Sequence, residues 1–223
     1  MKTETLSFNT AGGETTAFVT APDDASADSK PVLLIQEWWG LNEHIKDVAR
    51  RYAEEGFVCI APDLYRGKVA SDSSEASQMM HDLKLEDGLD TIRNAIDKAR
   101  ETYGFSHFGV TGYCMGGTYA PRAACELEGL SAAAPFYGDV PDEDVLKNLT
   151  VPTIFISGTK DQWINPEKVA QLEEITEKYE LPLTSVKYEA DHAFFNDTRP
   201  EVYDETAARD AWALVIGFFK DNL

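Results

Sequence analysis

From residue 31 onward, short apolar runs alternate with amphipathic runs of helical spacing, and this alternation limits the fold more than any other feature. Buried strands are indicated at Val32 to Ile35, Phe57 to Ala61, Phe108 to Thr111, Ser131 to Phe136, Pro152 to Ser157 and Thr184 to Tyr188. Helices are indicated at Ile45 to Ala53, Leu85 to Ala99, Cys114 to about Glu126, Asp142 to Leu149, Pro166 to Tyr179 and Ala208 to Phe219. Such alternation is typical of βαβ units and predicts a three-layer α/β/α sandwich around a mostly parallel sheet.

The N-terminal segment predicts a different element. Thr15 to Thr20 is rich in strand-forming residues and follows the turn signal Gly12-Gly13, which indicates an antiparallel hairpin at the edge of the sheet. Composition predicts loops at Pro22 to Lys30 and Lys68 to Ser77. Because no repeat or interdomain linker interrupts the chain, residues 1–223 are expected to form a single domain.

Charge and composition exclude several classes of function. The chain has 20 Lys and Arg against 39 Asp and Glu, a formal charge of −19, so nucleic acids and anionic membrane surfaces are not expected as partners. No apolar run is long enough to span a bilayer and the start has no secretory signal, which predicts a cytoplasmic protein. Cys59, Cys114 and Cys125 are scattered and odd in number, so neither disulfides nor a metal site is expected.

One cysteine follows a predicted strand directly and precedes a predicted helix. The segment Gly112-Tyr113-Cys114-Met115-Gly116 has the G-x-nucleophile-x-G form of a nucleophile elbow, with Cys in the usual Ser position. The helix N-terminus would lower the pKa of the thiol and present the Met115 N–H to a developing oxyanion. Taken alone, the motif is also compatible with a structural cysteine in a packed turn; a phosphate-binding loop fits less well, because the glycine spacing differs.

An acid and a histidine follow later strands in the order that an α/β-hydrolase triad requires. Asp161 lies just past the strand ending at Ser157, and His192 lies just past the strand ending at Tyr188. The other histidines, His44, His81 and His107, fall on predicted helices or at a strand entry, where solvated or capping roles are expected. The order therefore favours Cys114, Asp161 and His192 as a catalytic triad.

Over nearly its whole length the chain resembles the dienelactone hydrolase (carboxymethylenebutenolidase) family, a cysteine-nucleophile branch of the α/β hydrolases. The resemblance rests on Gln36-Glu37-Trp38-Trp39-Gly40, Ala61-Pro62-Asp63-Leu64-Tyr65, Gly112-Tyr113-Cys114-Met115-Gly116-Gly117, Gly158-Thr159-Lys160-Asp161 and His192-Ala193-Phe194. It implies that Cys114 is the nucleophile, His192 the base and Asp161 the group that orients it. It further implies that Glu37 interacts with the resting thiol, and that the backbone N–H groups of Met115 and Trp38 form the oxyanion hole.

The resemblance also implies an activity, which is hydrolysis of small esters or lactones through a thioester on Cys114, without metal or organic cofactor. Aromatic side chains in or beside the motif loops are expected to line the substrate pocket. They are Trp39, Tyr65, Tyr113, Tyr137, Trp163 and Phe194.

The sequence departs from the best-known family members where these bind the carboxylate of their substrate. Ala193 and Asn196 stand where those members carry Ser and Arg, and Ser71 to His81 contains no Arg to match a second carboxylate-binding arginine. Arg66 and Arg199 could supply a replacement from neighbouring loops. Because Ala and Asn cannot replace bidentate Arg recognition, we expect neutral esters or lactones rather than carboxylated dienelactones.

Two other classes of function remain open at this level. A non-catalytic binding protein of the same fold would keep the pocket for a ligand or partner, whereas a thiol redox protein is disfavoured because no C-x-x-C motif is present. We expect a monomer or a small homo-oligomer. As a hypothesis, the acidic surface reflects a cytoplasm of high salt concentration, where charge screening removes the self-repulsion.

Overall fold

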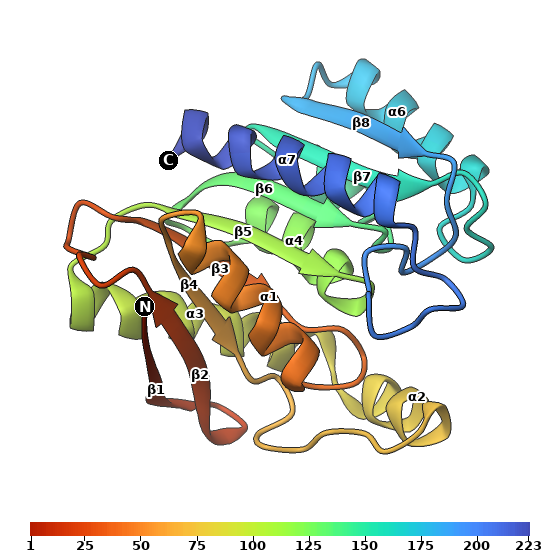
Figure 1. The fold of residues 1–223 in the computed structure, drawn as a ribbon. Helices are drawn as coiled ribbons and strands as arrows, with labels where there is room; N and C mark the ends of the chain where they lie inside the picture. The colour runs from red at the N-terminus through yellow and green to blue at the C-terminus, as the bar shows by residue number, and fades with distance from the viewer.

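Eight strands form one sheet in the order β1-β2-β4-β3-β5-β6-β7-β8 in the computed structural model, which describes residues 1–223 (Figure 1). The first two strands pair antiparallel, as do β2 and β4, and all other neighbours are parallel. The predicted hairpin and mostly parallel sheet are therefore confirmed. The strands are β1 (Lys2–Thr10), β2 (Gly13–Ala21), β3 (Lys30–Ile35), β4 (Phe57–Pro62), β5 (Phe108–Tyr113), β6 (Leu130–Phe136), β7 (Thr153–Gly158) and β8 (Leu183–Tyr188).

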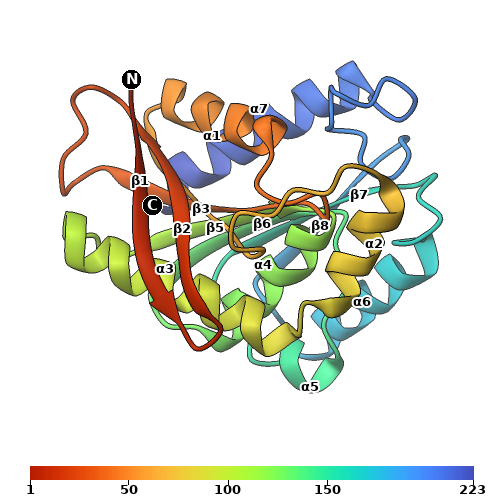
Figure 2. The ribbon, with the colours of Figure 1, turned by 90° about the horizontal axis from the view of Figure 1, so that it is seen from below.

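Helices cover both faces of this sheet, so the predicted three-layer sandwich and α/β-hydrolase fold are confirmed. Figure 2 shows α1 and α7 on one face, with α3, α4 and α6 on the other. None of the helices combines the length and the apolar composition that crossing a bilayer would require. The helices are α1 (Glu43–Glu54), α2 (Ser73–Asp82), α3 (Leu85–Tyr103), α4 (Met115–Glu126), α5 (Glu143–Leu146), α6 (Pro166–Lys178) and α7 (Glu205–Asn222).

The central strands are apolar along their whole length because both of their faces are buried. In β3, Leu33 and Ile35 belong to the hydrophobic cluster beneath α3 and α4, whereas Val32 and Leu34 belong to the cluster beneath α1 and α7. Successive side chains of a strand point to opposite faces, so a strand between two helical layers needs apolar residues at every position. Charged side chains are thereby confined to the strand ends and the surface.

Two predicted elements differ in the structure. Helix α2 begins at Ser73, inside the segment Lys68 to Ser77, for which composition predicts a loop. The Asp72 side chain caps this helix by accepting a hydrogen bond from the Glu75 N–H, and only Ala76 of α2 is buried, so its composition resembles that of a loop. Helix α5 is also shorter than expected, and spans only Glu143–Leu146.

The predicted solvated or capping role is wrong for His44. This side chain is buried on α1, with Nδ1 3.4 Å from a carboxylate oxygen of Asp197, and burial lowers its pKa. His81 and His107 are exposed, as expected.

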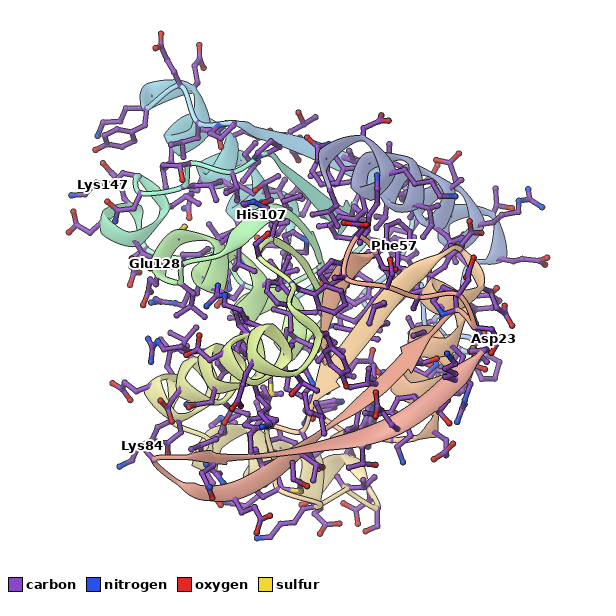
Figure 3. All side chains as sticks on the ribbon, turned by 90° about the vertical axis from the view of Figure 1, so that its left-hand side faces the viewer. Asp23, Phe57, Lys84, His107, Glu128 and Lys147 are labelled. Atoms are coloured by element: carbon purple, nitrogen blue, oxygen red, sulfur yellow. The ribbon has the colours of Figure 1, made fainter.

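Most acidic residues lie on the surface, where the excess charge stays hydrated. Figure 3 shows charged side chains such as Asp23, Lys84 and Glu128 at the periphery of the molecule. Only three carboxylates, those of Glu37, Asp63 and Asp161, are buried. A buried charge is costly without partners, so these three positions indicate where the fold has a specific use for a carboxylate.

Candidate active site

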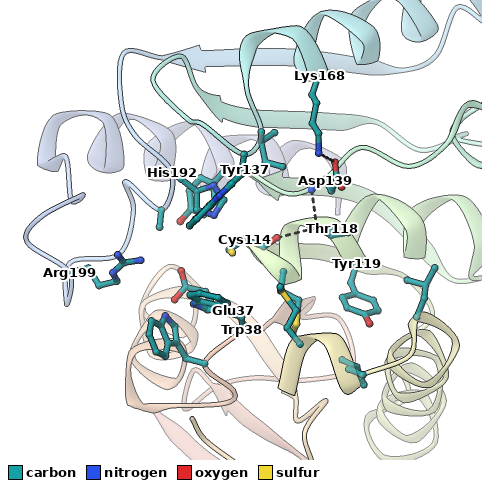
Figure 4. A pocket seen from close by; sticks show the side chains of 18 residues that line it. Glu37, Trp38, Cys114, Thr118, Tyr119, Tyr137, Asp139, Lys168, His192 and Arg199 are labelled. Carbon is teal, nitrogen blue, oxygen red and sulfur yellow. Dashed lines mark hydrogen bonds and ion pairs between the residues drawn. The ribbon is translucent and has the colours of Figure 1, made fainter. Parts of the chain in front are cut away.

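The predicted catalytic residues meet at the carboxyl edge of the parallel strands. Glu37 follows β3, Cys114 follows β5, Asp161 follows β7 and His192 follows β8. Three of them, Glu37, Cys114 and His192, line one cavity, with Cys114 at its centre in Figure 4. This edge is where open α/β sheets bind ligands, because the loops there converge.

The nucleophile elbow has the strained backbone that the motif predicts. Cys114 adopts φ 54° and ψ −112°, a left-handed conformation that is unfavourable for a residue with a Cβ. The turn is so tight that a Cβ on Gly112 would lie 2.3 Å from the Gly116 carbonyl oxygen, and one on Gly116 would lie 2.2 Å from that of Ile35. The glycines therefore let α4 begin directly against the ends of β5 and β3.

Burial raises the pKa of the Cys114 thiol to about 12, and the neighbouring Glu37 charge adds to the rise. The Met115 N–H at the start of α4 acts in the opposite direction but is outweighed. The expectation that the helix N-terminus would leave the thiol with a lowered pKa is therefore wrong. In this state the thiol is neutral. The free energy needed to bury a thiolate at the floor of the pocket exceeds the stabilisation that the N-terminus of one helix gives to the negative charge.

His192 and Asp161 form the hydrogen-bonded pair expected of a base and its orienting acid. His192 Nδ1 lies 2.6 Å from Asp161 Oδ2, while Asp161 Oδ1 accepts the backbone N–H groups of Trp163 and Ile164 at 2.8 and 2.9 Å. Burial opposes ionisation of Asp161, but the bond to His192 and those two N–H groups hold its pKa below the usual value. The carboxylate is therefore ionised and fixed.

The second ring nitrogen of His192, Nε2, is free to take part in a reaction. This nitrogen is buried without a hydrogen-bond partner, and no hydrogen bond joins it to Cys114. Trp163 packs edge-on against the imidazole with ring centroids 4.8 Å apart, and Tyr137 lies 5.1 Å away. These contacts and Asp161 fix the ring orientation, so that Nε2 is the nitrogen free to exchange a proton.

Glu37 is held in place by Asn196, a residue at which the sequence departs from the best-known family members. Asn196 Nδ2 donates to Glu37 Oε2 at 2.8 Å, and Asn196 Oδ1 accepts from the N–H and hydroxyl of Thr198. No hydrogen bond joins Glu37 to Cys114, so the predicted interaction with the resting thiol is electrostatic. Burial raises the pKa of Glu37 to about 7, against the opposing effects of Asn196 and Arg199.

The cavity has a volume of about 440 Å³ and is lined mainly by apolar side chains. Of the aromatic residues predicted to line it, Trp39, Tyr137 and Trp163 do so, with Trp163 61% exposed at the rim. Trp38 and Met115, the predicted oxyanion-hole residues, also line it.

Three other aromatic predictions are wrong, because those rings pack into the interior. Tyr113 stacks between Phe136 and Phe195 on the α1 and α7 side of the sheet, with centroid distances of 4.5 and 4.8 Å. Phe194 is fully buried in the same cluster. Tyr65 is buried behind Met115, with its hydroxyl 3.2 Å from the Met115 sulfur.

Of the two arginines considered as replacements for the missing ones, only Arg199 lines the cavity. Its guanidinium pairs with Glu201 at 2.8 Å. Arg66 instead donates to the Thr10 hydroxyl at the tip of the N-terminal hairpin. No group of three or more His, Cys, Asp or Glu side chains is arranged to hold a metal ion.

One whole wall of the cavity consists of residues that no sequence motif predicts. Its residues come from the end of α2, the start of α3, the first turns of α4, the loop after β6, the loop before α6 and the first turn of α6. They are Met80, Leu83, Leu85, Thr118, Tyr119, Asp139, Ile164 and Lys168. None belongs to a motif, and helical spacing by itself does not separate a pocket wall from a core face.

Comparison with known proteins places these features in one family. The sequence profile of the "Dienelactone hydrolase family" matches residues 15–223. "Protein usf" of Aquifex pyrophilus is 36% identical over 205 residues, covering 86% of this chain and 88% of its own. A protein of Aquifex aeolicus named "Putative carboxymethylenebutenolidase" has the same identity and coverage.

Solved structures agree with the sequence relatives. A crystal structure from Klebsiella pneumoniae, titled "Putative Dienelactone Hydrolase", superposes with a TM-score of 0.88 at 26% identity and covers 98% of each chain.

Exchange of the elbow glycine tests the close packing at Cys114. We expect Gly116→Ala to lower the free energy of unfolding by about 2–3 kcal/mol, because the added methyl meets backbone atoms that cannot move aside. Gly217→Ala on α7 is the matched control: its methyl meets nothing within 4 Å, so it should raise stability by about 0.5–1 kcal/mol. Urea unfolding measures both, and equal stabilities of the two variants would contradict the packing described.

Glu37→Gln tests the buried carboxyl. The folded protein keeps a proton on Glu37 up to about pH 7, whereas the unfolded chain releases it near pH 4.5, the ordinary pKa of a glutamate side chain. Folding therefore becomes less favourable as the pH rises between these values, by about 3 kcal/mol in total, and Glu37→Gln should remove this loss. Urea unfolding of both proteins from pH 4 to 8 measures the difference; parallel stability curves would show that Glu37 titrates normally.

Proposed function

This chain belongs to the dienelactone hydrolase family, and from that premise we propose that it hydrolyses small neutral esters or lactones through a Cys114-His192-Asp161 triad. The observation that carries the proposal is the His192 ring. One nitrogen is fixed on the ionised Asp161, and the other is buried, unpaired and in the same cavity as the thiol. A positioned imidazole beside a nucleophile at an elbow is the arrangement used for acyl transfer.

The proposed reaction begins with the neutral thiol. As Sγ of Cys114 attacks the substrate carbonyl carbon, the thiol proton passes to Nε2 of His192, and Asp161 stabilises the resulting imidazolium. His192 then gives the proton to the leaving alcohol oxygen, and a thioester remains on Cys114. Water attacks this thioester with His192 as base, which releases the carboxylic acid and restores the thiol.

Two backbone N–H groups are proposed to stabilise the tetrahedral oxyanion. Met115 is the first residue of α4, and its N–H is close enough to the thiol to lower the thiol pKa. Trp38 lies in the turn after β3, and its N–H donates to no other backbone group. Donors that are already fixed before the charge develops stabilise it with little reorganisation.

Glu37 is proposed to control when the thiolate forms. Its charge raises the pKa of Cys114, so protonation of Glu37, or its displacement by substrate, favours loss of the thiol proton. Because the pKa of Glu37 is raised to about 7, its charge changes within the working range of most cytoplasmic enzymes.

The proposed substrates are neutral because both cationic side chains that line the cavity are already paired with acidic residues and are not free to bind a substrate carboxylate. Arg199 is paired with Glu201, and Lys168 is paired with Asp139 at 2.7 Å. The formal charge of −19 also opposes the approach of anions. Both observations support esters and lactones without a charged group.

A non-catalytic binding protein is the second candidate. The thiol pKa of about 12 and the absence of a Cys114–His192 hydrogen bond favour it, since an active cysteine is often already activated. The two candidates differ in whether an acyl group is ever transferred to Cys114.

Trapping of the acyl-enzyme separates these candidates. We expect p-nitrophenyl acetate to be turned over, and intact mass spectrometry of an early quench to show one acetyl group, which Cys114→Ala abolishes. Cys125→Ala is the matched control, because Cys125 lies at the other end of α4 and outside the cavity. An acetyl adduct or turnover that persists in Cys114→Ala would rule out the proposed nucleophile.

The base is tested in the same assay. His192→Ala should lower kcat/KM by about 10²–10⁴-fold while the circular dichroism spectrum stays unchanged, because the ring acts as acid and base. His81→Ala, which removes an exposed histidine of α2, should retain the wild-type rate. A wild-type rate in His192→Ala would remove this residue from the mechanism.

A further inference from the structure

The cavity extends from Cys114 in two directions that differ in character. On one side it is lined by Glu37, Trp39 and Arg199, two of which are charged. Figure 4 shows the opposite side running past Tyr119 toward the helices α2 and α3. We call this second side the apolar arm and define it by Met80, Leu83, Leu85, Tyr119 and Ile164.

The apolar arm continues the hydrophobic cluster beneath α3 and α4. Tyr119 and Ile164 belong to that cluster, and Met80, Leu83 and Leu85 pack against it while remaining half-exposed. The polar groups at its border are already satisfied: Lys168 pairs with Asp139, whose backbone N–H donates a hydrogen bond to the Thr118 hydroxyl oxygen at 2.8 Å. The arm thus offers apolar surface without a free charge, which suits a hydrocarbon chain.

The position of His192 determines which part of an ester enters this arm. His192 Nε2 gives its proton to the leaving oxygen, so the alcohol part must lie on the His192 side. Ala193 and Tyr137, whose ring packs against His192, belong to the opposite hydrophobic cluster, beneath α1 and α7. The acyl chain attached to Cys114 is then directed away from His192, toward Tyr119 and Leu83.

We propose that the apolar arm is an acyl-chain site, and that the preferred substrates are esters of unbranched, neutral fatty acids longer than acetate. This inference rests on the proposed thioester mechanism and specifies its substrate class. Each methylene that enters the arm leaves water, and such burial raises kcat/KM by about fourfold per methylene. The preference must follow the acyl part and not the alcohol part.

Two ester series test this assignment on the intact protein. In the first, p-nitrophenyl acetate, butyrate, hexanoate and octanoate vary the acyl chain; we expect kcat/KM to rise about 250-fold from acetate to hexanoate, which differ by four methylenes. In the second, methyl, butyl and hexyl acetate vary the alcohol, and we expect less than a fivefold change. An equal rise in both series, or no rise in the first, would overturn the assignment.

A bulkier side chain in the apolar arm gives a variant that tests the same assignment. Leu83→Trp should lower the ratio of the hexanoate to the acetate kcat/KM at least tenfold, because the indole occupies the space of the chain. Leu214→Trp, the same exchange at a 38% exposed position on α7, should leave this ratio unchanged. A wild-type ratio in a folded Leu83→Trp protein would also overturn the assignment.

Intact mass spectrometry of the acylated protein shows whether the acyl-chain site alone is wrong or the proposed thioester mechanism is wrong as well. If Cys114 carries an acyl group with every ester but shows no preference for chain length, the mechanism stands and the acyl-chain site is wrong. If no ester gives an acyl group on Cys114, both are wrong. Should Leu83→Trp not fold, the two ester series with the wild-type protein decide the question alone.

Discussion

Burial of the parallel sheet on both faces is the constraint on which the rest of the structure depends. Residues such as Val32 and Leu33 on β3 face opposite helical layers, so neither face of a central strand can carry a charged group. Chemistry is possible only where the strands end. The loops after β3, β5, β7 and β8 therefore bring together side chains that are up to 155 positions apart, Glu37 and His192 among them.

The buried carboxylates at this edge show how the local donors decide the charge of a group. Asp161 receives hydrogen bonds from His192 and two backbone N–H groups, and its pKa falls although it is buried. Glu37 has one amide partner, Asn196, and burial raises its pKa to about 7. Two carboxylates in one site thus acquire different properties, one a permanent anion and the other a group that can change charge near neutrality.

Chain order and local pattern were sufficient to predict the sheet, the hairpin and the convergence of Cys114, Asp161 and His192, because these follow from where strands end. What depends on three-dimensional packing was not predictable. Tyr113 turns into the core because alternate residues of β5 face opposite layers, and α2 was hidden by its polar composition. The raised pKa of the thiol depends mainly on desolvation, which no motif encodes, whereas Glu37, which adds to the rise, belongs to a motif. The hydrogen bond between Asn196 and Glu37 likewise joins residues 159 positions apart in the sequence, so it could not be predicted from a local pattern.

Helix α2 buries only Ala76, yet its end supplies part of the wall of the apolar arm. Exchanges at half-exposed positions such as Met80 and Leu83 therefore cost little folding energy, whereas changes at the elbow disturb tightly packed backbone. Natural variation can accumulate on this wall without loss of the fold. The proposed acyl-chain site and the proposed triad occupy separate parts of the chain, so the first can change without disturbing the second.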